Sequence, residues 1–168
     1  MNNLELMTTV QALFSTNPFV SNLPLQGLQQ IALQEGCETE AYQDSLGNYT
    51  IGIGHTPAYP GEVWTVDQCF RQFFQDVVNI GADPLTSALP WARETMGIIR
   101  WWVFVNMTFN MGINGFLEFT ATIEAAKQQN WEGCAQGMEE SLWYNQVGQR
   151  SIELCQQMRT NKWVLPEV

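Results

Sequence analysis

Strand-forming residues are confined to one short part of this chain, and that confinement limits the folds it can adopt. β-prone runs at 41–43 and 49–53 flank the sequence Asp-Ser-Leu-Gly-Asn, which is typical of a hairpin turn. In most of the remaining chain, apolar residues recur at helical spacing, which predicts helices. Because the strands are segregated into one place, the sequence predicts an α+β fold.

The expected helices follow from periodicity and from end signals. Gly36 is a natural stop for the first helix of the main domain, and Thr65-Val-Asp-Gln68 resembles a capping box at the start of the next. The apolar stretch Trp101–Leu117 contains three asparagines and is shorter than the roughly 20 residues of a membrane span, so it predicts a buried core helix. The expected helical ranges are 25–35, 65–80, 85–89, 93–111, 116–128, 131–140 and 146–160.

A length of 168 residues suits one compact domain with two lobes. Residues 1–23 read as an N-terminal extension with helical spacing, broken by prolines, and residues 24–168 as the main domain. Within it we expect a hairpin lobe at about 36–64 and a larger, mostly helical lobe at about 65–168. The extension and the negative charge leave three explanations open: the extension packs on the core, it tethers the protein to a virion or partner, or the host wall or medium is unusual.

The net charge of −10 excludes several classes of function. A phosphate-binding protein needs a basic face, so nucleic acid is not an expected partner, and an anionic membrane surface would repel this chain. The N-terminus lacks a basic region and contains Glu5, which does not fit a secretory signal. The sequence therefore predicts a protein made in a cytoplasm and not stably inserted in a membrane.

The four cysteines give no metal-binding pattern. They are widely spaced without a CxxC motif, and a single histidine cannot complete a zinc site with two His ligands. Reduced, mostly buried thiols are the simplest reading, and the redox state stays open.

Two carboxyl groups of unlike surroundings stand close together in the sequence. Glu35 ends a helix that packs on apolar neighbours, which favours a protonated general acid, while Asp44 lies in the more solvated hairpin. Most glycosidases use such a pair of carboxyl groups as their catalytic residues. Ordinary structural roles remain open: Asp44 can cap its own turn, Glu35 can be solvated, Thr50 can be a strand residue, and His55 can belong to the core.

Three blocks of sequence carry a family resemblance. Glu35-Gly, Ala41-Tyr-Gln-Asp44 and Thr50-Ile-Gly-Ile-Gly-His55 resemble the signature of the T-even-type phage lysozymes (glycoside hydrolase family 24), with eight residues between Glu35 and Asp44 and five between Asp44 and Thr50. Residues 105–115 with Phe119-Thr, and residues 141–146 with Arg150 and 158–163, look like later blocks of that family. They occur in the family's order over about residues 25–163.

The resemblance implies a muramidase with a lysozyme-like fold and an active-site cleft between the two lobes. Glu35 resembles the general acid, Asp44 the carboxylate that activates the attacking water, and Thr50 the hydroxyl that helps to hold that water. The reaction is expected to invert the anomeric centre and to need no metal or cofactor. Arg150 matches an arginine near the catalytic Glu, and His55 and Asp76 match a pair that joins the hairpin to the following helix.

The resemblance also places substrate contacts. Phe109, Asn110 and Thr122 match positions that line the saccharide cleft. Asn110 stands where glutamine is common, Gly137 replaces a polar contact residue and Thr56 replaces an apolar one. Trp143 is read as a core residue in preference to a sugar platform.

The expected substrate is peptidoglycan, cut at the β-1,4 bond between N-acetylmuramic acid and N-acetylglucosamine by a monomer. The resemblance implies an endolysin that waits in the host cytoplasm and reaches the periplasm through a holin-type pore. The alternatives are a virion-associated lysozyme, a non-catalytic glycan-binding or structural module, and chitin-type hydrolysis in the same cleft. Host, stem-peptide preference and the reason for the negative charge stay open.

Overall fold

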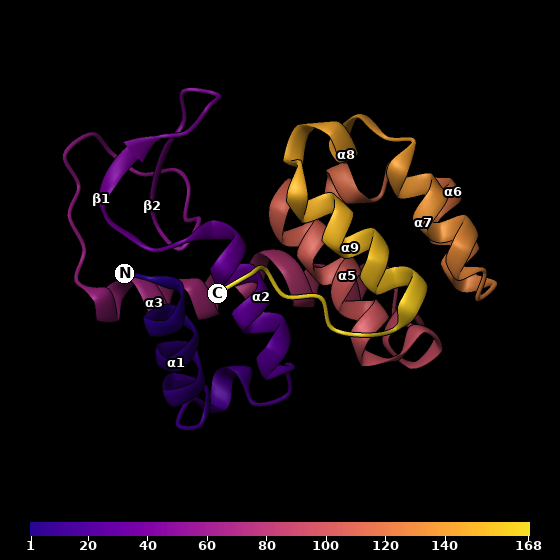
Figure 1. The fold of residues 1–168 in the computed structure, drawn as a ribbon, viewed down its shortest axis with the longest axis horizontal. Coiled ribbons are helices and arrows are strands. Elements are labelled where there is room, and N and C mark those ends of the chain that lie inside the picture. The colour runs from indigo at the N-terminus through magenta and orange to yellow at the C-terminus, as the bar shows by residue number, and fades with distance from the viewer. The chain divides into compact units, whose positions relative to one another are not determined.

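The computed structural model describes residues 1–168, which form two compact units. Unit 1 comprises Met1–Val78 with Glu167–Val168, and unit 2 comprises Asn79–Pro166. Nine α-helices and one two-stranded sheet make up the chain (Figure 1), so the predicted α+β class is confirmed.

In unit 1 the elements are α1 (Asn3–Phe14), the 3-10 helix η1 (Pro18–Val20), α2 (Leu25–Glu35), β1 (Glu38–Gln43), β2 (Tyr49–Gly52) and α3 (Val66–Asp76). The π-helix η2 (Val77–Ala82) follows, and unit 2 holds α4 (Asp83–Ala88), α5 (Ala92–Phe116), α6 (Thr120–Lys127), α7 (Trp131–Glu139), α8 (Leu142–Val147) and α9 (Gln149–Thr160).

The predicted hairpin is present in unit 1. β1 and β2 are antiparallel, with Tyr42 opposite Thr50, and the register is irregular between Glu38 and Tyr42. The loop after β2 returns along β1, where Ala41 N donates to Glu62 O at 2.9 Å and Trp64 N donates to Thr39 O at 2.8 Å. Both sides of β1 are therefore hydrogen-bonded, which leaves little free strand edge.

The N-terminal helix α1 packs on α2, beside which it runs in Figure 1. A capping box starts α1: Glu5 N donates to Asn2 Oδ1, and Asn2 N donates to Glu5 Oε2. Leu6 and Val10 are buried on one face, while Leu4 is 63% exposed on the other. Hydrophobic burial therefore holds α1 against the rest of unit 1.

The long helix α5 supplies the core of unit 2. Its residues Trp101–Thr108 are all buried, as expected for a core helix. The helix is interrupted at Gly97 and Gly112, which have φ of +75° and +81°. None of the helices combines the length and apolar character that crossing a membrane requires.

The prediction of a single helix over 146–160 is wrong. Two helices occupy this region, because Ser141 Oγ accepts from Tyr144 N and starts α8 early, and Gly148 separates α8 from α9 with φ of +61°. A residue with a side chain would be strained at that φ, so the glycine permits the turn. The capping box at Thr65 and Gln68, in contrast, forms as predicted.

All four cysteines are buried free thiols. Burial raises the pKa of Cys69, Cys134 and Cys155 to about 12, and it also raises the pKa of Cys37. Thiols with such pKa values stay protonated near neutral pH, so they behave as small apolar side chains.

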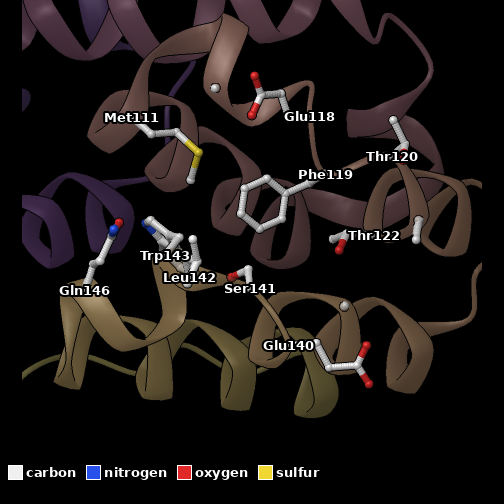
Figure 2. A pocket seen from close by; sticks show the side chains of 13 residues that line it. Met111, Glu118, Phe119, Thr120, Thr122, Glu140, Ser141, Leu142, Trp143 and Gln146 are labelled. Atoms are coloured by element: carbon white, nitrogen blue, oxygen red, sulfur yellow. The ribbon is translucent and has the colours of Figure 1, made fainter.

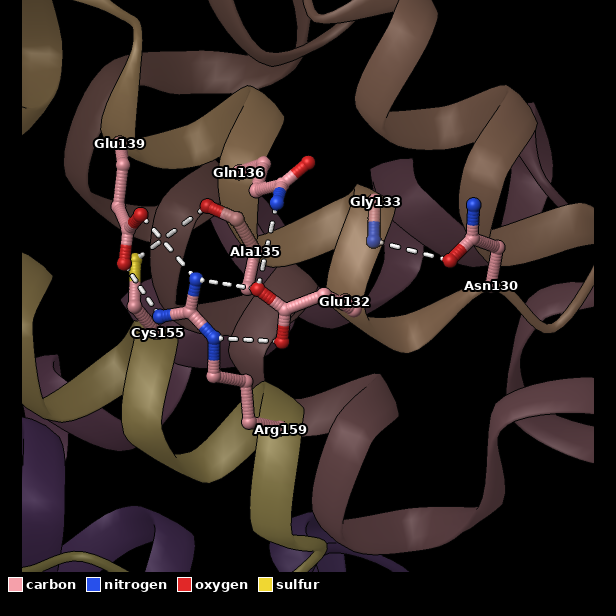
Figure 3. A network of polar contacts seen from close by, with 8 residues as sticks. All are labelled: Asn130, Glu132, Gly133, Ala135, Gln136, Glu139, Cys155 and Arg159. Carbon is pink, nitrogen blue, oxygen red and sulfur yellow. Dashed lines mark hydrogen bonds and ion pairs between the residues drawn. The ribbon is translucent and has the colours of Figure 1, made fainter.

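An arginine with two carboxylate partners ties α7 to α9 (Figure 3). Arg159 donates to Glu132 through Nε and Nη2, both at 2.9 Å, and to Glu139 through Nη1 and Nη2. These hydrogen bonds lower the pKa of Glu132 and of Glu139 and raise that of Arg159. Multiple charge-assisted bonds make this network firmer than an isolated surface pair.

We predict that Leu6→Ala lowers the free energy of unfolding by about 3 kcal/mol, because it removes buried methyl groups and leaves a cavity between α1 and α2. Chemical denaturation measures the change. Leu4→Ala, on the exposed face of the same helix, is the control and should stay within about 0.5 kcal/mol of the wild type. Equal effects of the two changes would show that α1 does not pack as described.

We predict that Arg159→Gln lowers the melting temperature by about 3 °C at pH 7. A carboxyl whose pKa is lowered in the folded protein stabilises it above the ordinary value of 4.5, and the stabilisation disappears as the pH falls through the lowered value. The difference between variant and wild type should therefore shrink below about pH 4.

Thermal melts from pH 7 down to pH 3 check this dependence. Arg71→Gln is the matched control, because Arg71 pairs only with the exposed Asp67 four residues away. A pH-independent difference for Arg159→Gln would contradict the role given to the two carboxylates.

Candidate active site

Glu35 is placed by the end of α2. It is the last residue of the helix, and Gly36 follows with φ of +71° while its N–H donates to Ala32 O at 2.9 Å. This glycine turns the chain from α2 towards β1 within a few residues. The half-buried Glu35 side chain thereby lies at the junction between the helix and the hairpin.

The Glu35 carboxyl lies directly against the backbone of Gly54. A Cβ atom built on Gly54 would lie 2.7 Å from Glu35 Oε2 and 2.8 Å from Cδ, and Gly54 has φ of +72°. Only a residue without a side chain leaves room for the carboxyl in this position. Gly54 is thus a positioning residue for Glu35, which sequence reasoning missed; its signal was the Gly-Ile-Gly pattern before His55.

Asp44 is held at the start of the hairpin turn. Its Oδ1 accepts hydrogen bonds from Leu46 N and from Asn48 N, both at 2.9 Å. Asp44 therefore caps its own turn through one carboxylate oxygen, which is the ordinary structural role considered above. Because these bonds use Oδ1, they fix the direction of the carboxylate and leave Oδ2 outside the turn.

Thr50 is buried in β2 opposite Tyr42. Directly paired residues of antiparallel strands project to the same face, so the phenol and the hydroxyl share one side of the hairpin. Burial, followed by the negative charges of Glu35, Glu38 and Asp44, raises the pKa of Tyr42. The sequence did not single out Tyr42 as a neighbour of Thr50.

His55 and Asp76 meet as the sequence predicts. His55 Nδ1 lies 2.7 Å from Asp76 Oδ2, and Gln72 Nε2 donates to Asp76 Oδ1 at 2.8 Å. The His55 ring also lies against Trp64, with 5.2 Å between ring centroids. These contacts connect the turn after β2 to α3, so they support the segment that carries Gly54.

The remaining predicted residues belong to unit 2. Asn110 Oδ1 accepts from Trp143 Nε1 at 2.8 Å, and Trp143 is buried, in agreement with its core reading. Arg150 Nε donates to Asn106 Oδ1 at 2.9 Å, which holds the guanidinium on α9 against α5. Phe109 is half-buried on α5, and Thr122 is buried on α6, where it lines an open pocket.

The fold and the hairpin together define a class. An α+β chain with a glutamate at the end of a helix, and with an aspartate and a threonine in the small hairpin that follows, has the composition of a lysozyme-type glycoside hydrolase. Comparison with known proteins gives the family: a model described as phage lysozyme matches residues 32–161, and the chain belongs to this family. It is therefore a lysozyme, a glycoside hydrolase.

Individual relatives are distant in sequence. Probable T4-type lysozyme 1 of Dictyostelium discoideum is 25% identical over 154 residues, which cover 75% of this chain and 89% of that protein. Probable T4-type lysozyme 2 of the same organism is 23% identical over 142 residues, covering 70% of this chain and 84% of that protein. Pre-baseplate central spike protein Gp5 of Enterobacteria phage T4 is 23% identical over 159 residues, covering 80% of this chain and 28% of that protein.

We predict that Gly54→Ala reduces lysozyme activity by about 100-fold, because the new methyl group displaces the Glu35 carboxyl from its place. The positive φ adds about 1–2 kcal/mol of destabilisation. Rate measurements on purified peptidoglycan and a thermal melt separate the two effects.

Gly61→Ala is the matched control for this substitution. Gly61 has φ of +80° in the same unit, but a Cβ there meets nothing within 4 Å. It should lose stability to a similar extent and keep its activity. Equal losses of activity in both variants would show that strain, and not displacement of Glu35, is responsible.

Proposed function

We propose that this lysozyme is a muramidase that cleaves the β-1,4 bond between N-acetylmuramic acid and N-acetylglucosamine in peptidoglycan. One observation carries the proposal: Glu35 and Asp44 are both fixed in unit 1 by the backbone around them, Glu35 against Gly54 and Asp44 by two turn amides. Two carboxyl groups held in different surroundings can divide the roles of acid and base between them.

The proposed chemistry uses these residues in sequence. Glu35 donates a proton to the glycosidic oxygen as the bond to the anomeric carbon breaks. Asp44, through the oxygen that the turn does not use, removes a proton from a water that attacks the anomeric carbon from the opposite face. Thr50 helps to hold this water. The new bond forms on the opposite side of the sugar, so the configuration inverts.

The other predicted residues take supporting roles in this proposal. In this proposal Arg150 has a supporting role, and His55 and Asp76 keep the segment with Gly54 in place. Phe109, Asn110 and Thr122 contact the substrate. The Asn110 side-chain oxygen accepts a hydrogen bond from Trp143 Nε1, so its amide N–H groups remain to donate to a sugar.

We assign the activity to lysis of a bacterial host by a phage. As an endolysin the protein would reach the wall through a pore made by another protein. A virion-associated lysozyme is the second candidate, supported by the likeness of 80% of this chain to a protein named as a baseplate spike. A non-catalytic glycan-binding module would not require Glu35 and Asp44 to be fixed in this way.

We predict that Glu35→Gln abolishes the clearing of outer-membrane-stripped Gram-negative cells, with a rate at least about 1,000-fold lower, because glutamine cannot donate the proton. The fall in turbidity measures the rate. In addition, ¹H NMR of a wild-type digest should show the α-anomer as the first product if the configuration inverts.

Glu38→Gln is the control, because Glu38 is an exposed carboxylate on the nearby strand β1. It removes the same charge and should clear cells at the wild-type rate. Clearing by Glu35→Gln would refute the assigned acid. Binding of sacculi without clearing by the wild type would favour the glycan-binding module.

A further inference from the structure

Two of the buried thiols lie next to each other in unit 1. Cys37 follows the turn at the end of α2, and Cys69 lies near the start of α3. A hydrogen bond joins the two thiols, and Cys69 Sγ also lies 3.9 Å from the backbone oxygen of Glu38, the residue after Cys37. Sulfur atoms within hydrogen-bonding reach can form a disulfide after small rotations of the side chains.

The two thiols differ in exposure and in acidity. Cys37 is 9% exposed, whereas Cys69 is 0% exposed. Burial raises the pKa of Cys37, and the hydrogen bond with Cys69 lowers it in part. Burial and the charge of Cys37 raise the pKa of Cys69 to about 12. Cys37 is therefore the thiol that an external disulfide meets first, and Cys69 is the thiol that completes the bond.

The chain between these two cysteines carries most of the candidate active site. Residues 37–69 include both strands of the hairpin together with Asp44, Thr50 and Gly54. Glu35 lies two residues before this segment. A bond between its two ends would close the segment into a loop and would fasten it to α3. Such a cross-link restricts the unfolded chain and makes local opening of the loop less favourable.

We propose that Cys37 and Cys69 form a disulfide bond in an oxidising compartment, and that this bond fastens the hairpin of unit 1 to α3. The free thiols described above are then the reduced form of the pair. Disulfides persist in oxidising compartments and are rare in the cytoplasm. An endolysin moves from the cytoplasm to the periplasm. Only this change of compartment rests on the proposed function, because the pair of thiols is a feature of unit 1 itself.

The bond forms by exchange with an external disulfide, which accepts the two electrons. The thiolate of Cys37 attacks one sulfur of that disulfide and releases one thiol, so a mixed disulfide remains on Cys37. Cys69 loses its proton to water, attacks the Cys37 sulfur and releases the second thiol. In sum, two protein thiols are oxidised and the external disulfide is reduced to two thiols.

The other two cysteines provide an internal comparison in unit 2. Cys134 on α7 is 0% exposed and Cys155 on α9 is 2% exposed. Cys155 donates to the backbone oxygen of Ala135, 3.9 Å from its sulfur (Figure 3), and burial raises the pKa of both thiols to about 12. Since neither thiol reaches the surface to begin an exchange, this pair should stay reduced.

The test incubates the folded full-length protein with oxidised glutathione at about pH 8. Peptide mapping without reduction should find one linkage, between Cys37 and Cys69, and free thiols at Cys134 and Cys155. A disulfide is used as the oxidant because peroxide would also oxidise methionines such as Met111, which lines the open pocket of unit 2 (Figure 2).

The bonded form should melt about 8 °C higher than the reduced form, because the cross-link closes a long loop. Amide hydrogen exchange in residues 38–68 should slow as well. Cys69→Ala should stop at a mixed disulfide of Cys37 with glutathione and should lose both effects. Cys37→Ala should form neither product, and Cys134→Ala is the control that should form the bond as the wild type does.

Three results would overturn the inference. They are a linkage between Cys134 and Cys155 in place of the proposed one, a folded wild type that forms no linkage, and a bonded form that melts no higher than the reduced form. Cleavage of peptidoglycan by a protein that forms no linkage would leave the muramidase intact. Formation of the linkage in a protein without activity in either form would support the disulfide and overturn the muramidase.

Discussion

The close approach of Glu35 to Gly54 is the contact on which the candidate active site depends. It requires α2 to end at Glu35, the turn after β2 to return next to that end, and position 54 to lack a side chain. The contact between His55 and Asp76 ties the same turn to α3. Each of these features is common in proteins. Together they hold the Glu35 carboxyl in a fixed place.

The negative charge is distributed unevenly, and this bears on how the protein meets its substrate. Unit 1 has nine acidic residues and one basic residue, whereas unit 2 has eight and six. A chain with this charge gains no long-range attraction to an anionic wall, so recognition must rely on contacts at short range.

The departures from the family pattern have physical explanations where the structure shows their surroundings. Gly137 leaves room for the buried Thr122 side chain, because a Cβ at position 137 would overlap the Thr122 hydroxyl. The segment after His55 lies along β1 through backbone hydrogen bonds. The additional helix α1 buries Leu6 and Val10 on unit 1. These changes leave Glu35, Asp44 and Thr50 in one unit.

The sequence by itself determined the fold class, the hairpin and most helices, because spacing, caps and turn residues act locally. The contact between His55 and Asp76 was expected from the family resemblance alone. It also indicated which carboxyl ends a helix and which begins a turn. Only the tertiary structure decided that Gly54 lies against Glu35, that Tyr42 stands beside Thr50, and that Glu118, Glu140 and Thr122 share a pocket. These contacts join residues far apart or on different elements. They depend on how helices and strands pack, which no local pattern in one sequence specifies.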